Sequence, residues 1–191
     1  MKICIFSSAN TGITEENILL AQQVGTYLAE RGVTVMTGGC TGLPAIVAET
    51  VFAHGGETIG YFPDLNERDL LANARLHNND LFHNCYTHKR FFKGFMYRSV
   101  RMIEDADGAI VFSGRFGTLS EFTIAVEEGL KVAVIEGTGG ITDEIRRLAD
   151  IVDRQFPDSH VVFSNDYKQA IDRLIENIHV EQNTTPFAND R

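Results

Sequence analysis

The feature that most constrains the fold is a short apolar run that ends in a glycine turn and opens a helix. It occurs twice. One copy, GAIVFSGRFGTLSEFTIA, spans Gly108–Ala125, and the other leads from Val33 through Gly38–Gly42. Glycines allow a close backbone approach or a positive φ, and the start of a helix presents free N–H groups and a positive dipole to anions. The pattern predicts two anion-binding turns in an α/β protein.

Apolar runs alternate with helical segments along the whole chain. We predict strands at Lys2–Phe6, Val33–Met36, Thr58–Phe62, Gly108–Phe112, Lys131–Ile135 and Val161–Phe163. Helices are predicted at Glu15–Arg31, Leu43–His54, Thr118–Gly129, Thr142–Asp153 and Asp166–Ile178, with another ending near Asp105. Strands alternating with helices are typical of a parallel sheet covered on both faces.

This alternation predicts a single Rossmann-like doubly wound domain over residues 1–180, with a mostly parallel sheet of about six or seven strands. Ligands bind at the carboxyl ends of the strands in such sheets. The polar turns after Phe6, Thr37 and Phe112 would all lie at that edge. Residues 181–191 are polar and are expected to form a flexible C-terminal tail.

The stretch between the two glycine turns is the least periodic. We expect Asp64–Asn84 to be a loop with one short helix near Glu67–Ala74. In the helix that follows, an apolar stripe is predicted to face inward, with basic residues opposite: Phe91, Phe92, Phe95, Met96, Val100 and Ile103 against Arg90, Arg98 and Arg101. Arg98 then has two interpretations, a solvated basic face or an anion contact at the sheet edge.

Composition narrows the classes of partner. The chain has 191 residues, with 17 Lys and Arg against 26 Asp and Glu, and a net charge of −9. Nucleic-acid binding draws on basic residues, so this charge argues against it. Cys4, Cys40 and Cys85 are too few and too scattered for a disulfide framework. With no signal peptide expected and no apolar run near the ~20 residues of a membrane span, we expect a cytoplasmic protein.

Several motifs are excluded by their spacing. Neither glycine turn has the G-x-G-x-x-G fingerprint or a P-loop lysine, which argues against NAD binding and ATP hydrolysis. No G-x-S-x-G elbow is present, so a serine hydrolase is not expected. The run His83-x-Cys85-x-x-His88 matches no established zinc spacing, and we predict no metal site.

Thr118-x-x-Glu121 also has two interpretations. It fits a capping box, in which the threonine caps the helix start and contributes roughly 1 kcal/mol without any functional role. Alternatively, Glu121 faces the ligand, where a carboxylate orients water or stabilises positive charge. Spacing alone leaves both open.

Several of these residues together resemble the LOG (lonely guy) family. The resemblance rests on Arg98-x-x-x-Met102-x-x-x-Ala106-Asp107, followed by Ser113-Gly114-Arg115-Phe116-Gly117-Thr118-x-x-Glu121. Gly38-Gly39-Cys40-Thr41-Gly42 is similar to the family's earlier glycine turn, and Ser7-Ser8 to its serine turn after the first strand. The similarity runs in order from about Met1 to Ile135.

The resemblance implies a Rossmann-like protein, usually dimeric, that splits a nucleoside 5′-monophosphate into free base and ribose 5-phosphate. The family's catalytic residues fall on Arg98 and Glu121, and no metal or redox cofactor is implied. The residues that would bind phosphate or nucleotide are Ser8, Gly38, Gly39, Thr41, Gly42, Gly114, Arg115, Gly117 and Thr118. The expected partners are a nucleotide monophosphate and further copies of this chain, not nucleic acid or membrane.

The chain departs from the family's motif at several positions. Ser113 stands for a proline, Arg115 and Cys40 for glycines, and Ser99 for a lysine. These departures keep a second interpretation open, a non-catalytic carrier or sensor of a nucleotide or molybdenum cofactor on the same fold. Related DprA proteins bind DNA, which the acidic charge argues against.

Overall fold

The structure is a computed structural model that describes residues 1–10, 13–76 and 82–184. Its strands are β1 (Lys2–Phe6), β2 (Thr34–Thr37), β3 (Thr58–Phe62), β4 (His88–Phe91), β5 (Gly108–Phe112), β6 (Lys131–Ile135) and β7 (Val161–Ser164). Its helices are α1 (Glu15–Glu30), α2 (Leu43–Ala53), α3 (Glu67–Leu76), α4 (Phe95–Glu104), α5 (Phe116–Glu127), α6 (Ile145–Ile151) and α7 (Tyr167–Thr184). Two short 3-10 helices, η1 (Phe82–Cys85) and η2 (Gly140–Glu144), complete the described elements.

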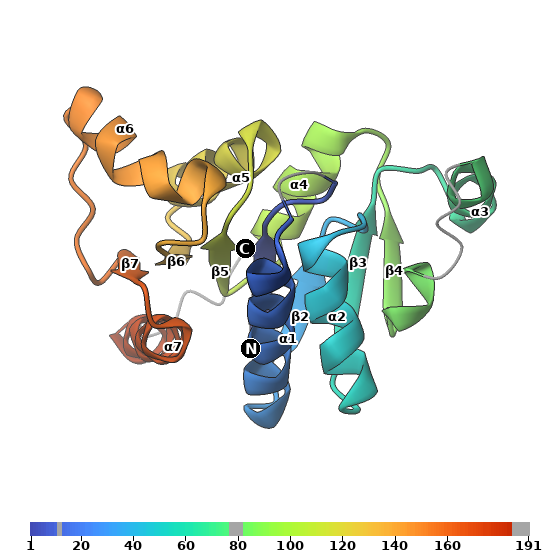
Figure 1. The fold of residues 1–191 in the computed structure, drawn as a ribbon, viewed down its shortest axis with the longest axis horizontal. Coiled ribbons are helices and arrows are strands. Elements are labelled where there is room, and N and C mark those ends of the chain that lie inside the picture. The colour runs from blue at the N-terminus through green and yellow to red at the C-terminus, as the bar shows by residue number, and fades with distance from the viewer. Residues whose placement is uncertain (11–12, 77–81, 185–191) are drawn as a thin grey trace.

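The strands form one 7-stranded sheet in the order β4-β3-β2-β1-β5-β6-β7. Every neighbouring pair is parallel, which confirms the predicted doubly wound fold. The chain builds outward from β1 to β4 and then returns to place β5 on the other side of β1 (Figure 1). The switch point, where such sheets bind ligands, therefore lies between β1 and β5.

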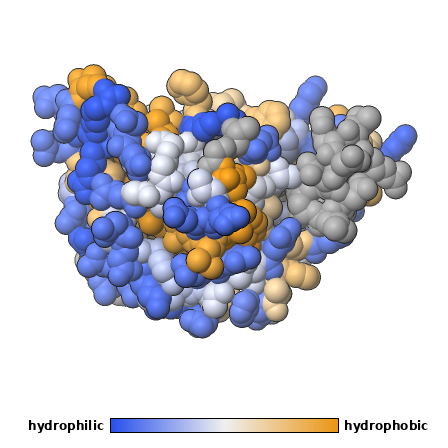
Figure 2. Space-filling view, in the orientation of Figure 1, coloured by the Kyte–Doolittle hydropathy of each residue, from blue (hydrophilic) through white to orange (hydrophobic). Residues whose placement is uncertain are grey.

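Helices cover both faces of the sheet. Helices α1, α2 and α7 pack on one face around a core that includes Leu28, Val47 and Leu174. Helices α4, α5 and α6 cover the other face, and their core includes Met102 and Phe122 (Figure 1). Figure 2 shows a mostly hydrophilic surface over α7 and a hydrophobic area over α1, where Leu19 is 55% exposed. None of the described helices is long and apolar enough to cross a membrane.

Most elements lie where the sequence predicts them, but β4 was missed. Residues His88–Phe91 form an edge strand that pairs with β3, and helix α4 begins only at Phe95. The sequence pattern predicts a helical stripe through Phe91 and Phe92 instead, because apolar residues recur there at a spacing close to 3.6. At the other end of the chain, α7 continues to Thr184, beyond residue 181 where the polar tail was expected to begin.

The predicted orientation of α4 is also wrong in its first turns, although Ile103 is buried as predicted. Phe95 and Met96 are 70% and 61% exposed, whereas Arg98 and Ser99 are buried with Met102. The helix is rotated so that the arginine faces the interior. The interpretation of Arg98 as part of a solvated basic face is therefore wrong.

Candidate functional site

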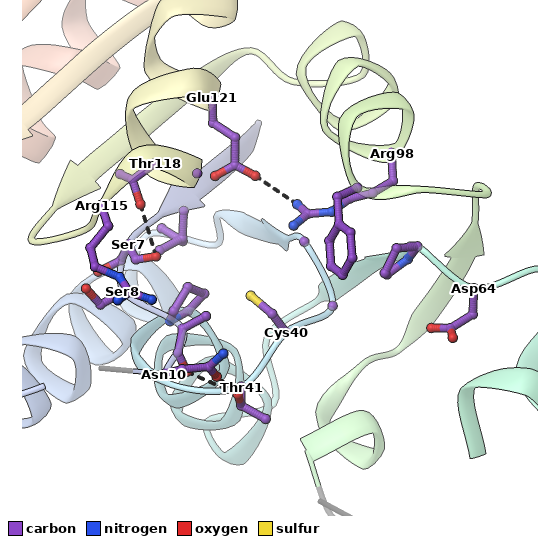
Figure 3. Close-up of a pocket in the computed structure, with 18 of the residues that line it drawn as sticks. Ser7, Ser8, Asn10, Cys40, Thr41, Asp64, Arg98, Arg115, Thr118 and Glu121 are labelled. Carbon is purple, nitrogen blue, oxygen red and sulfur yellow. Dashed lines mark hydrogen bonds and ion pairs between the residues drawn. The ribbon is translucent and has the colours of Figure 1, made fainter. Parts of the chain in front are cut away.

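A cavity of about 820 Å³ opens at the switch point of the sheet (Figure 3). Its floor comes from the turns that follow β1, β2 and β5, and its walls come from α4, α5 and the segment around α3. Residues that were far apart in the sequence meet here because the carboxyl ends of parallel strands share one edge. This is the place at which the fold predicts a ligand.

An ion pair between α4 and α5 lies in the cavity wall. Arg98 Nη1 donates to Glu121 Oε1 at 2.8 Å, and the two side chains are only 9% and 13% exposed. Ser99 Oγ donates to the same carboxylate oxygen at 2.9 Å. No described residue hydrogen-bonds to Glu121 Oε2, so one carboxylate oxygen is held and the other is available to a ligand.

The protein environment raises the pKa of the Glu121 carboxyl above its ordinary value. Burial is the main cause, because it disfavours the charged form, while Arg98 and the hydrogen bond from Ser99 act in the opposite direction. Perturbed carboxyl groups in clefts are typical of functional sites. Glu121 is therefore placed where a general base or an electrostatic stabiliser would be expected.

The Arg98 guanidinium lies directly against the backbone of Gly38. A Cβ atom at position 38 would fall 1.8 Å from Arg98 Nη1, so only glycine leaves room for the arginine. Arg98 Nε is buried and has no hydrogen-bond partner among the described residues. A buried donor left without an acceptor costs about 1–3 kcal/mol, more when charged, and an oxygen of a bound ligand would remove that cost.

The turn between β5 and α5 is held by hydrogen bonds to the β1 turn. Gly114 N donates to Ser8 Oγ at 3.1 Å, and Ser7 Oγ donates to Phe112 O at 2.6 Å. Ser113 adopts a φ of 55°, and its N–H donates to Thr138 Oγ1 at 2.7 Å. The LOG motif has a proline at this position. Proline cannot adopt this positive φ and has no N–H to donate, so the turn of this chain differs from that of the motif.

The capping-box interpretation of Thr118 is wrong. The N-cap residue of α5 is Arg115, and Thr118 Oγ1 donates to Ser7 O at 3.2 Å instead of capping the helix. The N–H groups of Phe116, Gly117 and Thr118 have no acceptor among the described residues. They form the free first turn of a helix of 12 residues that points at the cavity.

The earlier glycine turn offers fewer donors. Leu43 N at the start of α2 already donates to Ser8 O at 2.9 Å, and Pro44 has no N–H. Gly42 has a φ of 77°, and a Cβ there would lie 2.3 Å from Ala9 O, so it packs one turn against another. The two turns are thus not equivalent, and the geometry favours α5 as the anion site.

Most of the predicted site residues line the cavity: Ser8, Gly38, Gly39, Thr41, Arg98, Arg115, Gly117, Thr118 and Glu121. Gly42 and Gly114 do not line it and instead shape the turns beside it. The sequence prediction missed Asn10, Asp64, Leu70, Asn73 and Phe95, which also line it. The advance signal for Asp64, Leu70 and Asn73 is the long aperiodic segment after β3, and the signal for Asn10 is the polar turn after β1.

The described residues contain no group of three or more His, Cys, Asp or Glu side chains that could hold a metal ion. Cys85 is buried beside Phe62 and Tyr86, and His88 Nε2 lies 3.2 Å from Glu57 Oε1. The side chain of His83, the third residue of that run, lies outside the described ones. Cys85 and His88 therefore contact different parts of the structure.

The sheet and its cavity define a Rossmann-like protein with a candidate ligand site at the switch point. The chain belongs to the SLOG cluster4 family, whose sequence model matches residues 1–171. The predicted resemblance to LOG-like proteins is confirmed at this level. One relative is the probable cytokinin riboside 5′-monophosphate phosphoribohydrolase LOGL5 of Oryza sativa subsp. japonica, 27% identical over 63% of this chain and 45% of that protein.

Solved structures with the same fold have varied ligands. The molybdenum cofactor binding protein of Rippkaea orientalis is 19% identical, with a TM-score of 0.72 over 93% of this chain and 96% of that one. The single-stranded DNA-binding DNA processing protein A of Helicobacter pylori is 16% identical, with a TM-score of 0.63 over 93% and 81%. Because this fold includes DNA-binding proteins, it does not support the predicted exclusion of nucleic acid.

Proposed function

We propose that the protein is a phosphoribohydrolase that splits a nucleoside 5′-monophosphate into free base and ribose 5-phosphate. The observation that carries the proposal is the Arg98–Glu121 pair, buried in a cavity next to the free first turn of α5. The likeness to the rice phosphoribohydrolase supports it, although the alignment covers less than half of that protein.

The proposed chemistry uses the two carboxylate oxygens of Glu121 differently. Arg98 and Ser99 hold Oε1, and Oε2 faces the ribose. As the bond between C1′ and the base nitrogen breaks, positive charge develops on the ribose, and the carboxylate stabilises it. Water then bonds to C1′, and its proton is transferred to the departing base, which balances the reaction. The α5 N-terminus would hold the 5′-phosphate and so orient the sugar.

The test is to incubate the purified protein with AMP, GMP, CMP and UMP and to measure free base by chromatography. Base release at a rate proportional to protein concentration is expected for at least one nucleotide. If no base is released but a nucleotide raises the melting temperature, the protein is a carrier or sensor on the same fold, and the glycosidase proposal is wrong.

The pH dependence of base release gives a second prediction. Glu121 acts as a carboxylate in this mechanism, so the rate should fall as the pH is lowered through its pKa. That midpoint should lie above the ordinary glutamate value, because burial raises the pKa of Glu121. Ser99→Ala removes a donor that lowers this pKa, so the acid midpoint should move to higher pH.

Ser120→Ala is the matched control, since Ser120 lies beside Glu121 on α5 and its Oγ contacts Met96 Sδ at 3.9 Å instead. It should leave the midpoint unchanged. An acid midpoint that is the same in Ser99→Ala and in the unmodified protein would show that Glu121 does not control the rate.

A further inference from the structure

Arg115 occupies an unusual place for a basic side chain. It is the N-cap residue of α5, it lines the cavity, and it is exposed. Figure 3 shows its guanidinium lying beside Ser8, on the same side of the cavity as Thr118. The related motif has a glycine here, and the φ of −138° at Arg115 accepts any side chain.

The charge of Arg115 is uncompensated. The N-terminus of a helix carries partial positive charge, so a cation there is unfavourable. Among the described residues, Arg115 has no ion pair and no side-chain hydrogen bond. Except for Arg68, every other arginine whose side chain the structure describes is paired with a carboxylate. The protein thus places a lone cation at a helix N-terminus that lines the cavity.

A second, independent observation in the cavity also calls for an anion or an acceptor oxygen. Arg98 is 7% exposed, and its buried Nε has no partner among the described residues. The Glu121 carboxylate neutralises the charge of Arg98, but it accepts a hydrogen bond from Nη1 and not from Nε. The cavity therefore contains a buried donor without an acceptor, in addition to the first turn of α5, whereas the α2 turn has its first N–H already bound to Ser8 O.

We propose that Arg115 is a specificity-determining residue that binds the phosphate of a sugar phosphomonoester, together with the first turn of α5. The planar guanidinium presents two parallel N–H groups to two phosphate oxygens, which a lysine ammonium does not do. The preferred ligands are ribose 5-phosphate and nucleoside 5′-monophosphates, and uncharged ribose and nucleosides are poor ligands. This inference rests on the proposed function, whose site it shares.

Binding is measured by titration calorimetry with ribose 5-phosphate as the probe and ribose as the uncharged comparison. The proteins are the unmodified chain, Arg115→Gly, Arg115→Lys and Arg68→Ala. Arg115→Gly introduces the glycine of the LOG motif and should weaken ribose 5-phosphate binding roughly 10- to 100-fold. Arg115→Lys should recover only part of that loss. Arg68→Ala removes the other unpaired arginine, on α3, and should bind as tightly as the unmodified protein.

The outcomes separate this inference from the proposed enzyme activity. Equal affinity of Arg115→Gly and the unmodified protein, with unchanged melting temperatures, would overturn the role of Arg115 even if base is released from nucleotides. Failure of the unmodified protein to prefer ribose 5-phosphate over ribose would also overturn it. Binding that depends on Arg115, in a protein that releases no base, would support the inference and refute the hydrolase.

Discussion

Replacing Glu121 by glutamine should lower base release from nucleoside 5′-monophosphates by about 100-fold or more. The substitution removes the negative charge that faces the ribose, yet it keeps an oxygen that accepts from Arg98 and Ser99. Nucleotide binding should therefore survive. The rise in melting temperature on adding AMP should be the same in the variant and in the unmodified protein.

Glu127→Gln is the matched control on the same helix. Glu127 is 62% exposed and lies 3.1 Å from Arg154 on the surface, away from the cavity. This variant should release base at the normal rate. If Glu121→Gln retains turnover, or if it loses nucleotide binding along with turnover, the assigned role of the carboxylate is wrong.

Gly38→Ala should produce the second large effect without unfolding the protein. The added methyl group would overlap Arg98 Nη1, which is the far end of a flexible side chain and can move. Once displaced, the guanidinium loses its 2.8 Å bond to Glu121. A misplacement of about 1 Å in a catalytic group can lower the rate about 100-fold, and we expect a loss of that size in base release.

A double-mutant cycle tests whether the loss runs through Arg98. In an Arg98→Ala background the methyl group meets no guanidinium, so Gly38→Ala should cause no further loss of activity. Circular dichroism of each variant should be unchanged. Additive losses would place the effect of Gly38 elsewhere, for instance in a direct contact with the ligand.

Sequence periodicity predicts every described strand except β4. The strands β1, β3, β5 and β6 are short apolar runs with a turn at each end, and their predicted bounds agree with the structure. Parallel strands are buried on both faces, so their sequences are apolar throughout and easy to recognise. The position of the cavity then followed from the doubly wound order, because the carboxyl ends of the strands converge there.

Periodicity failed where the site itself overrides it. Arg98 and Ser99 are polar residues on the buried face of α4, and they are stable there because Glu121 pairs with them from another helix. The sequence pattern predicts that Phe95 and Met96 face inward, but both side chains are exposed in the structure. A local pattern cannot reveal a partner that lies 23 residues away in the chain, and functional sites are where such conflicts are expected.

The expected homodimer and the expected nucleotide ligand both stay predictions. The homodimer and the nucleotide monophosphate came only from the resemblance, and a single chain without a ligand tests neither. The similar solved structures share the fold alone, and they include a molybdenum cofactor binding protein and a single-stranded DNA-binding protein. The proposals for this chain therefore rest on the side chains that line its own cavity, above all Arg98, Glu121 and Arg115.

The backbone at Ser113 has a consequence for how the sequence can diverge. Its left-handed conformation and its N–H bond to Thr138 link the β5 turn to the loop after β6. A proline at this position would lose that bond and require the opposite sign of φ, so it becomes acceptable only after the neighbouring loop has changed as well. The turn of this chain and the turn of the LOG motif therefore differ by substitutions that depend on one another. Replacing Ser113 alone by proline should impair the protein.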